Sequence, residues 1–341
     1  MTSNSLGLFR RLSRRLARRH LSAVAAAALL ATAAGLAGPA LAQDGFPARP
    51  ITIVVGYTAG GANDILARIV AEKMSVAFKQ PVLVENRPGV ASIVGATFVA
   101  KAKPDGYTLL MGASGPISFN PSLYKSLPYS PEKDLVPVSL VGTFPLVLLT
   151  QAANPDTATL KGLVQFAKAH PEKANYSASA ASFQLISELF KRKSDTQFLY
   201  IPYKGSSESI IAVSAGDATM TLVDSGPAMP AIKGGRVRAL AITAAERAPY
   251  LPDTPTMKEL GIDMNVELWS GLFAPAGTPP AIVKKLEQAV HDAVAALDVQ
   301  QRISDLSITP VSSTSQELAA RVKSEIRMWQ DVATAAGIQP N

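Results

Sequence analysis

Cysteine is absent from the 341 residues of the sequence, and histidine and aromatic residues are scarce. Without cysteine the protein has no disulfide, no thiolate metal ligand and no cysteine nucleophile, so its stability must come from core burial alone. The three histidines, His20, His170 and His291, form no spacing with Asp or Glu that is typical of a metal site. We therefore expect no bound metal.

One long run without charge is present, at residues 21–43, and no second run of membrane-spanning length follows it. The run ends in Ala40-Leu41-Ala42 and is preceded by six arginines: Arg10, Arg11, Arg14, Arg15, Arg18 and Arg19. This order predicts a secretory signal peptide over residues 1–42, cleaved after Ala42. An uncleaved anchor is the alternative, and Ser13-Arg14-Arg15 leaves twin-arginine export open beside the general secretory route.

The excess of positive charge is concentrated in this first segment. The whole chain carries 33 Lys and Arg against 26 Asp and Glu, a net charge of +7. Six arginines and no acid precede residue 43, so 27 basic residues remain against 26 acidic ones. This near-neutral remainder excludes a basic surface for nucleic acid or an anionic membrane.

The pattern after residue 43 predicts an α/β protein. Short apolar runs alternate with amphipathic stretches, as in the strand at 51–55 and the helix at 63–78, and this rhythm favours parallel, doubly wound sheets. A second cycle of the same kind begins near Leu160. Two long helices end the chain, the second with a capping box at Thr314 and Glu317. We expect two lobes with a ligand between them.

The segment VGYTAGGAND at residues 55–64 lies where a strand ends and a helix begins. Unpaired N–H groups and the helix dipole favour an anion there, and Gly60 and Gly61 allow close approach of the backbone. A tight turn with a polar helix cap is the simpler interpretation. A P-loop is excluded because Ala62 and Asn63 replace its Lys and Ser/Thr. The candidate ligand-binding residues of this loop are Tyr57, Thr58, Gly60, Gly61 and Asn63.

Two more loops, at residues 112–115 and 177–182, follow predicted strands and carry serines. The first resembles a G-x-S-x-G nucleophile elbow but breaks that motif at Pro116, so a strand-end turn is the simpler interpretation. Both loops can donate hydroxyl and amide groups to a carboxylate. The candidates from these loops are Ser114, Ser177, Ser179 and Ser182.

Side chains at other loops and strand ends extend the candidate site. An aromatic residue there either faces a ligand or packs in the core, and a lysine either meets an anion or is solvated. Asp224 would repel a carboxylate, but it can cap the next turn or meet an amino or hydroxyl group of a ligand. The candidates of this group are Phe183, Tyr203, Lys204, Asp224 and Trp269.

Catalytic groups are poorly supplied. His170 ends a predicted helix, where a cation suits the dipole, and His291 lies on a polar helix face four residues after Glu287. Neither is adjacent in sequence to a candidate serine. A secreted serine hydrolase acting through Ser114 or Ser179 is the alternative function, since a triad can assemble through space.

Several motifs together carry a family resemblance over nearly all of the chain after residue 43. They are RPITIVV at 49–55, GG at 60–61 with Asp64 and Ala67-Arg68, PV at 81–82 with VENRPG at 84–89, PDGYTLL at 104–110, PYKGS at 202–206, RALAIT at 238–243, PDTPT at 252–256 and APAGTP at 274–279. Through them the chain resembles the substrate-binding proteins of tripartite tricarboxylate transporters, also called the Bug family.

The resemblance implies a two-lobed periplasmic-binding-protein fold of type II (Venus flytrap), with a mixed, mostly parallel sheet in each lobe. Lobe 1 would comprise residues 43–142 and 264–341, and lobe 2 residues 143–263. It also implies a periplasmic receptor without enzymatic activity or cofactor, which captures a carboxylate for permease subunits or a sensor. Ser225, next to Asp224, joins the candidate residues on this ground. We expect a monomer and no nucleic-acid partner.

Both ligand loops depart from the family pattern. Tyr57-Thr58-Ala59-Gly60-Gly61 replaces an aromatic-Pro-Pro-Gly-Gly loop and is more adaptable. In the second loop Ala180-Ala181 replaces glycine, Gln184 replaces histidine, and Phe183 adds bulk. These changes indicate a ligand other than a typical di- or tricarboxylate, such as an aromatic or smaller acid.

Overall fold

The computed structural model describes residues 45–340. The predicted signal peptide and its cleavage site lie outside this range. Within it, no helix is both long and apolar enough to cross a membrane. The described strands are β1 (Ile51–Val55), β2 (Val82–Asn86), β3 (Thr108–Ala113), β4 (Leu135–Gln151), β5 (Asn175–Ala178), β6 (Leu199–Pro202), β7 (Met220–Asp224), β8 (Val237–Ile242), β9 (Glu267–Pro275) and β10 (Thr309–Pro310).

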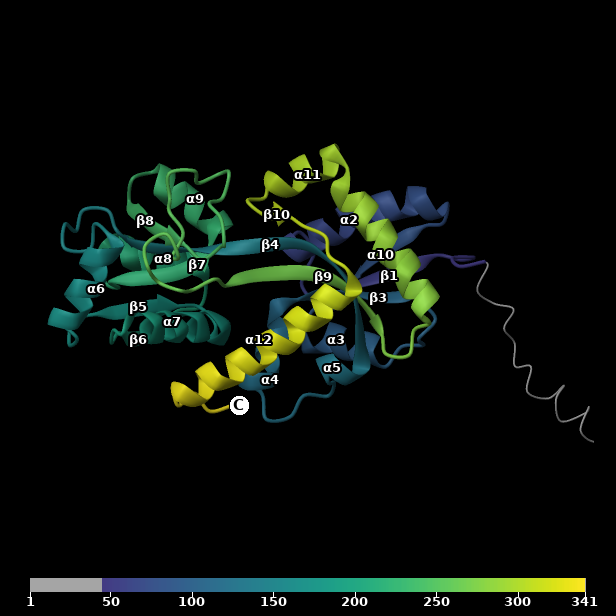
Figure 1. The fold of residues 1–341 in the computed structure, drawn as a ribbon, viewed down its shortest axis with the longest axis horizontal. Helices are drawn as coiled ribbons and strands as arrows, with labels where there is room; N and C mark the ends of the chain where they lie inside the picture. Colours follow the sequence, from purple (N-terminus) through teal and green to yellow (C-terminus); the bar gives the residue numbers. More distant parts are fainter. Residues whose placement is uncertain (1–44, 341) are drawn as a thin grey trace, which may run out of the picture. The chain divides into compact units, whose positions relative to one another are not determined.

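The strands join in the order β2-β1-β3-β9-β4-β7-β5-β6, with β8 and β10 also paired to β4. Strand β4 is shared: its residues Leu135–Pro145 pair with β9, and those from Leu146 onward pair with β7 and β8. We call the β2, β1, β3, β9 and β10 side the first half-sheet and the β7, β5, β6 and β8 side the second. Figure 1 shows β4 and β9 running side by side between the two.

Both half-sheets are mixed, as predicted, but neither is mostly parallel, because every pair made by the shared strand β4 is antiparallel. Parallel pairs join β2, β1 and β3 in the first and β7, β5 and β6 in the second. The pairs that involve β4 or β9 are antiparallel. The sequence pattern indicates only residues 146–150 of β4, because Pro137, Gly142 and Pro145 interrupt the stretch before them. Register shifts between Pro137 and Ser139 and between Leu140 and Gly142 let the strand continue through these residues.

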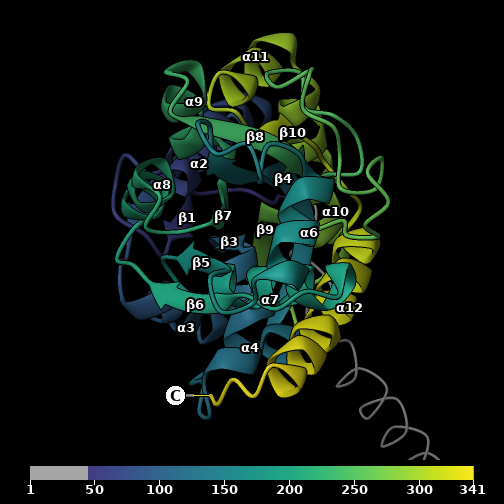
Figure 2. The same cartoon turned by 90° about the vertical axis from the view of Figure 1, so that its left-hand side faces the viewer.

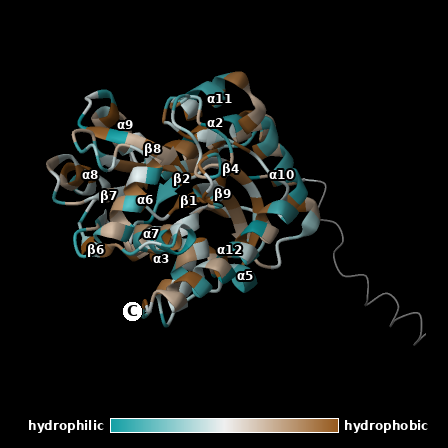
Figure 3. Cartoon of the chain, turned by 60° about the vertical axis from the view of Figure 1, so that its left-hand side comes forward, coloured by the Kyte–Doolittle hydropathy of each residue, from teal (hydrophilic) through white to brown (hydrophobic). Residues whose placement is uncertain are grey.

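Helices cover both faces of these sheets. They are α2 (Ala62–Phe78), η1 (Val90–Ser92), α3 (Ile93–Ala100), η2 (Gly115–Phe119), α4 (Asn120–Leu123), α5 (Pro131–Asp134), α6 (Leu160–Ala169), α7 (Ala181–Ser194), α8 (Ser206–Ala215), α9 (Ser225–Lys233), α10 (Pro280–Ala295), α11 (Leu297–Ser304) and α12 (Ser315–Ala335). In the hydropathy view, brown segments mark the strands and inward helix faces, and teal marks many outward faces (Figure 3).

Alternation along β4 decides which helices lie on which face of the second half-sheet. Successive side chains of a strand point to opposite faces. Leu146 and Leu148 pack in one cluster with residues of α6 and α7, whereas Val147 and Leu149 pack with residues of α8 and α9. Figure 2 shows the two pairs of helices on opposite sides of these strands.

The last three helices differ in part from the sequence prediction. The capping box at Thr314 and Glu317 is confirmed at the start of α12. The preceding helix is shorter than predicted: Ala296 is extended, with ψ 129°, and Leu297 begins a separate helix with 83% of its surface exposed. The turn at Ala296 therefore divides the first of the two predicted long helices into α10 and α11.

Helix α12 contacts the cores of both half-sheets. Leu318, near its start, is buried with Leu110 and Phe273 of the first. Trp329, near its end, is buried in a cluster with residues of the second and stacks on Phe119 at a ring distance of 4.5 Å. Helix α12 therefore packs against the cores on both sides of the shared strand β4.

Candidate functional site

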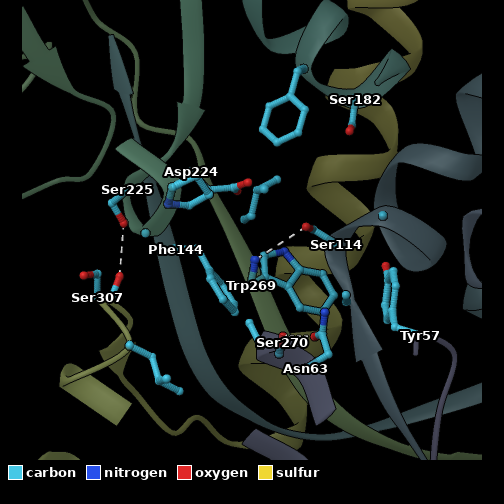
Figure 4. Close-up of a pocket in the computed structure, with 18 of the residues that line it drawn as sticks. Tyr57, Asn63, Ser114, Phe144, Ser182, Asp224, Ser225, Trp269, Ser270 and Ser307 are labelled. Atoms are coloured by element: carbon cyan, nitrogen blue, oxygen red, sulfur yellow. Dashed lines mark hydrogen bonds between the residues drawn. The ribbon is translucent and has the colours of Figure 1, made fainter. Parts of the chain in front are cut away.

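Four strand-to-helix junctions of the described chain meet at one cavity of about 340 Å³ (Figure 4). The junctions are β1–α2, β3–η2, β5–α7 and β7–α9. Each contributes a polar residue from or beside its helix start: Asn63, Ser114, Ser182 and Ser225. The first N–H groups of a helix have no partner within the helix, and the helix dipole makes that end positive. The cavity is therefore suited to an anion without any cationic side chain among its described lining residues.

A network around Asp64 fixes the β1–α2 junction. The buried Asp64 carboxylate accepts hydrogen bonds from the N–H of Gly60 at 2.9 Å, from Asn86 Nδ2 at 2.9 Å and from Arg68 Nε at 3.0 Å. Asn86 Nδ2 also donates to the carbonyl of Tyr57 at 3.1 Å. Burial raises the pKa of Asp64, but the hydrogen bonds outweigh it and hold that pKa below its ordinary value. Asp64 thus shapes the loop rather than facing the ligand.

Asn63 and Tyr57 are residues of the β1–α2 junction that line the cavity. Ser270 Oγ on β9 donates to Asn63 Oδ1, which leaves the Asn63 Nδ2 group available as a donor. Burial raises the pKa of Tyr57 to about 12, so its phenol is neutral at physiological pH. Figure 4 shows Asn63 beside Ser270 and Trp269, with Tyr57 at the edge of the same region.

The β3–η2 junction is supported from β9 and α12. Ser114 is 3% exposed, and its Oγ accepts a long hydrogen bond from the N–H of Trp269, at 3.5 Å. The indole Nε1 of Trp269 donates to Glu325 at 2.8 Å, and Arg321 pairs with Glu325 at 2.8 Å. The Trp269 ring is therefore held in the cavity wall by an ion pair on α12.

The β7–α9 junction carries the one carboxyl group among the residues that line the cavity. Burial raises the pKa of Asp224 to about 6, although its own backbone N–H and Ser206 offset part of the rise. Ser225 Oγ donates to the carbonyl of Ser307 at 3.1 Å and lies 3.1 Å from the hydroxyl of Tyr250. Ser225 therefore links α9 to the segment that follows α11.

Apolar side chains make up much of the remaining wall. Phe144 comes from β4 and Leu268 from its neighbour β9, and Phe119 comes from η2. Phe183 and Leu306 add apolar surface from α7 and from the segment after α11. The described lining contains no Lys, Arg or His.

The structure brings together part of the predicted site. The predicted residues that line the cavity are Tyr57, Asn63, Ser114, Ser182, Phe183, Asp224, Ser225 and Trp269. The others lie outside this lining: Thr58, Gly60, Gly61, Ser177, Ser179, Tyr203 and Lys204. Thr58, Gly60 and Gly61 are exposed in the β1–α2 loop, whereas Ser177 is fully buried in β5 and its Oγ donates to the carbonyl of Ser209. Lys204 is exposed, and its backbone N–H donates to Glu208.

Several lining residues carry no signal in the sequence. Phe144, Leu268 and Ser270 lie within strands, where an apolar or small side chain reads as core. Ser307 follows α11 and reaches the cavity only because the chain returns there. Pairing of β4 with β9 brings Phe144 opposite Leu268, a long-range register that local patterns do not encode.

The candidate catalytic groups do not meet. His170 ends α6, with Glu172 at 3.8 Å, and His291 Nδ1 lies 3.0 Å from Ser312 Oγ. Neither histidine is among the described residues that line the cavity with Ser114. No group of His, Cys, Asp and Glu in the described part of the chain has metal-binding geometry.

Comparisons with known proteins agree on one family. The profile of TctC, described as "Tripartite tricarboxylate transporter family receptor", matches residues 66–338. The protein BugT of Bordetella pertussis is 34% identical over 310 residues, which cover 89% of this chain and 94% of BugT.

Solved structures show the same fold. The structure of R. palustris Rpa4515 with adipate matches with a TM-score of 0.72 and 31% identity, covering 87% of this chain and 100% of that one. The periplasmic binding protein BugD matches with a TM-score of 0.69 and 31% identity, again over 87% of this chain and 100% of BugD. These similarities confirm the predicted fold class.

Proposed function

The chain belongs to the tripartite tricarboxylate transporter receptor family, and we propose that its cavity captures a small organic carboxylate for uptake. One observation carries this proposal: four helix starts meet at a cavity whose described lining has no cationic side chain. Oriented backbone N–H groups and hydroxyls are the donors left for the anion. The adipate held by the related R. palustris protein is an acid of this class.

Capture would proceed by closure of two lobes around the cavity. Lobe 1 comprises residues 43–142 and 264–341, and lobe 2 residues 143–263. Strand β4 runs through both half-sheets and the chain returns to the first at β9, and a few such connections are typical of hinges. Cavity residues come from both half-sheets, so closure would surround the ligand and release water.

The proposed site of action is the periplasm. The arginine-rich and apolar start of the sequence supports export, with cleavage after Ala42. Delivery to membrane permease subunits follows from the family, in which the protein acts as the receptor. Signalling to a sensor is the other use of the same capture step.

We propose binding without chemical turnover. Ser114, the strongest hydrolase candidate, contacts the N–H of Trp269 and has no histidine beside it in the described lining. Ser179 lies outside that lining. Nucleophilic catalysis by serine needs a base within hydrogen-bond reach.

A thermal-shift screen of the purified protein tests the proposal. The panel would contain mono-, di- and tricarboxylates, amino acids, sugars and inorganic cations. A cognate acid at a hundred times its Kd should stabilise the fold by about 2.7 kcal/mol, with no product formed on long incubation. Stabilisation by a sugar or a cation but by none of the acids would refute carboxylate capture, and turnover of an ester would favour the hydrolase.

A further inference from the structure

The charge of the cavity limits how many carboxylates a ligand can carry. Asp224 is the one carboxyl group in the described lining, and it has no Lys, Arg or His beside it there. Each carboxylate of a ligand must therefore be held by N–H groups and hydroxyls alone. A second carboxylate placed near Asp224 would also meet a like charge at short range.

The two ends of the cavity offer different groups. Figure 4 shows Ser225 and Ser307 on one side and Asn63 and Ser114 on the other, with the Asp224 side chain reaching from the first side toward the middle. The second end has the start of α2, with its unpaired N–H groups, the Nδ2 group of Asn63 and the nearby Ser114 hydroxyl.

The α9 end is poorly suited to an anion. The hydroxyl of Ser225 donates to the carbonyl of Ser307, so it is already used. Pro227, in the first turn of α9, has no N–H to offer. Asp224 occupies the N-cap position of α9 and adds negative charge there. An acceptor of this kind selects a ligand group that donates a hydrogen bond.

The space between the two ends is lined by rings. Phe119 and Trp269 are almost fully buried, and Phe144 faces the cavity from β4. Phe183 is 9% exposed at the start of α7. Flat apolar walls of this kind favour an aromatic ring over an aliphatic chain that carries polar groups. A volume of about 340 Å³ is sufficient for an acid with a single ring.

From these contacts we infer that the ligand is an aromatic monocarboxylate whose far end carries a hydroxyl or amino group. The carboxylate lies at the α2 start near Asn63 and the Ser114 hydroxyl, the ring lies against Phe144 and Trp269, and the distal group donates to Asp224. This inference rests on the proposed function and narrows its ligand class.

Calorimetric titration of the purified protein with four acids tests the inference. The probes are 4-hydroxybenzoate, benzoate, terephthalate and adipate. We expect 4-hydroxybenzoate to bind tightest, with benzoate weaker because it lacks a hydroxyl group that could donate to Asp224. Terephthalate should bind at least about tenfold more weakly than 4-hydroxybenzoate, because its second carboxylate meets Asp224.

The variant Asp224→Asn should reverse this preference. It removes the charge, so terephthalate gains affinity while 4-hydroxybenzoate loses about tenfold. The matched control is Asp217→Asn, at an exposed aspartate outside the cavity lining, which should leave all four affinities unchanged.

Two failures can be told apart. Binding of adipate without either single-ring monocarboxylate would overturn the aromatic class and leave carboxylate capture standing. Terephthalate bound as tightly as 4-hydroxybenzoate by the unmodified protein would overturn the role of Asp224. If none of the acids binds and a wider panel of acids also fails, the proposed function falls and the inference with it.

Discussion

Asp224 is the residue whose ionisation has the largest consequence for the cavity. Asp224 is the last residue of β7 and directly precedes α9, and burial raises the pKa of its carboxyl group to about 6. An aspartate in an unfolded chain has a pKa of about 3.9. The folded state therefore binds the proton more tightly than the unfolded state does, and folding stability falls as the pH rises from about 4 to about 6.

Replacing Asp224 by Asn should remove this pH-dependent loss of folding stability. The stability advantage of Asp224→Asn over the unmodified protein should grow between pH 4 and pH 6 and stay constant above it, because only the aspartate acquires a buried charge. Urea unfolding at a series of pH values measures the difference. Asp217→Asn is the control, and a pH-independent difference for Asp224→Asn would contradict the prediction.

At the scale of elements, the strand-to-helix junction is the unit from which the site is built. In the β1–α2 junction two adjacent glycines have different conformations. Gly60 has a φ of +84°, which side-chain-bearing residues rarely adopt, and its N–H donates to Asp64. Gly61 is the N-cap of α2, with φ −78° and ψ 165°, a conformation open to any residue.

The same substitution should therefore have opposite effects at the two positions. Gly60→Ser should destabilise the protein by about 1 kcal/mol, the cost of a side chain in the left-handed region. Gly61→Ser should be neutral or slightly stabilising, because serine is a preferred N-cap and the nearest atom to the new Cβ is Thr58 O at 3.7 Å. Urea unfolding compares the two; equal losses would show that the backbone conformation does not decide the outcome.

At the scale of the whole described chain, β4 runs through both half-sheets, the chain returns to the first at β9, and the cavity is lined by residues of both strands. Ser225 on α9 reaches the carbonyl of Ser307, which follows α11 and precedes β10 of the first half-sheet. This hydrogen bond is a contact that closure of the lobes would favour.

Ligand binding should make the protein more compact. Small-angle X-ray scattering with and without an acid that stabilises the protein should show a smaller radius of gyration in its presence. Ser225→Ala should speed release of the acid, since it removes a contact between the two sides. A sugar that does not bind serves as control, and identical scattering with and without the acid would argue against closure.

The sequence was informative wherever local chemistry decides the structure. Strand β1 has the predicted bounds, and helix α6 begins at Leu160, where the second cycle is predicted to begin, because short apolar runs and amphipathic periods reflect local burial. The Thr314–Glu317 capping box was predictable because both partners lie within one turn. Seven of the eight predicted site residues that line the cavity sit at junctions that glycine and serine mark in the sequence, whereas Trp269 lies in β9.

Pairing between strands that are far apart in the sequence determined the features that local patterns did not predict. Strand β4 continues through Pro137, Gly142 and Pro145, because it pairs with β9 along this stretch and register shifts occur beside Pro137 and Gly142. The same pairing moves Phe144 and Leu268 into the cavity wall. Conversely, Tyr203 and Lys204 follow a strand in the sequence but lie outside the lining.

By itself, the sequence determined the alternating α/β pattern, the export signal as a prediction, the family resemblance and the near-neutral charge of the remaining chain. Tertiary structure alone decided which four helix starts face one another, which rings separate them, and that Asp224 stands at one end without a cation among the described lining residues. The physical reason is that helix caps and amphipathic periods arise within a few residues, whereas a cavity is formed by segments that meet only after the sheet has paired.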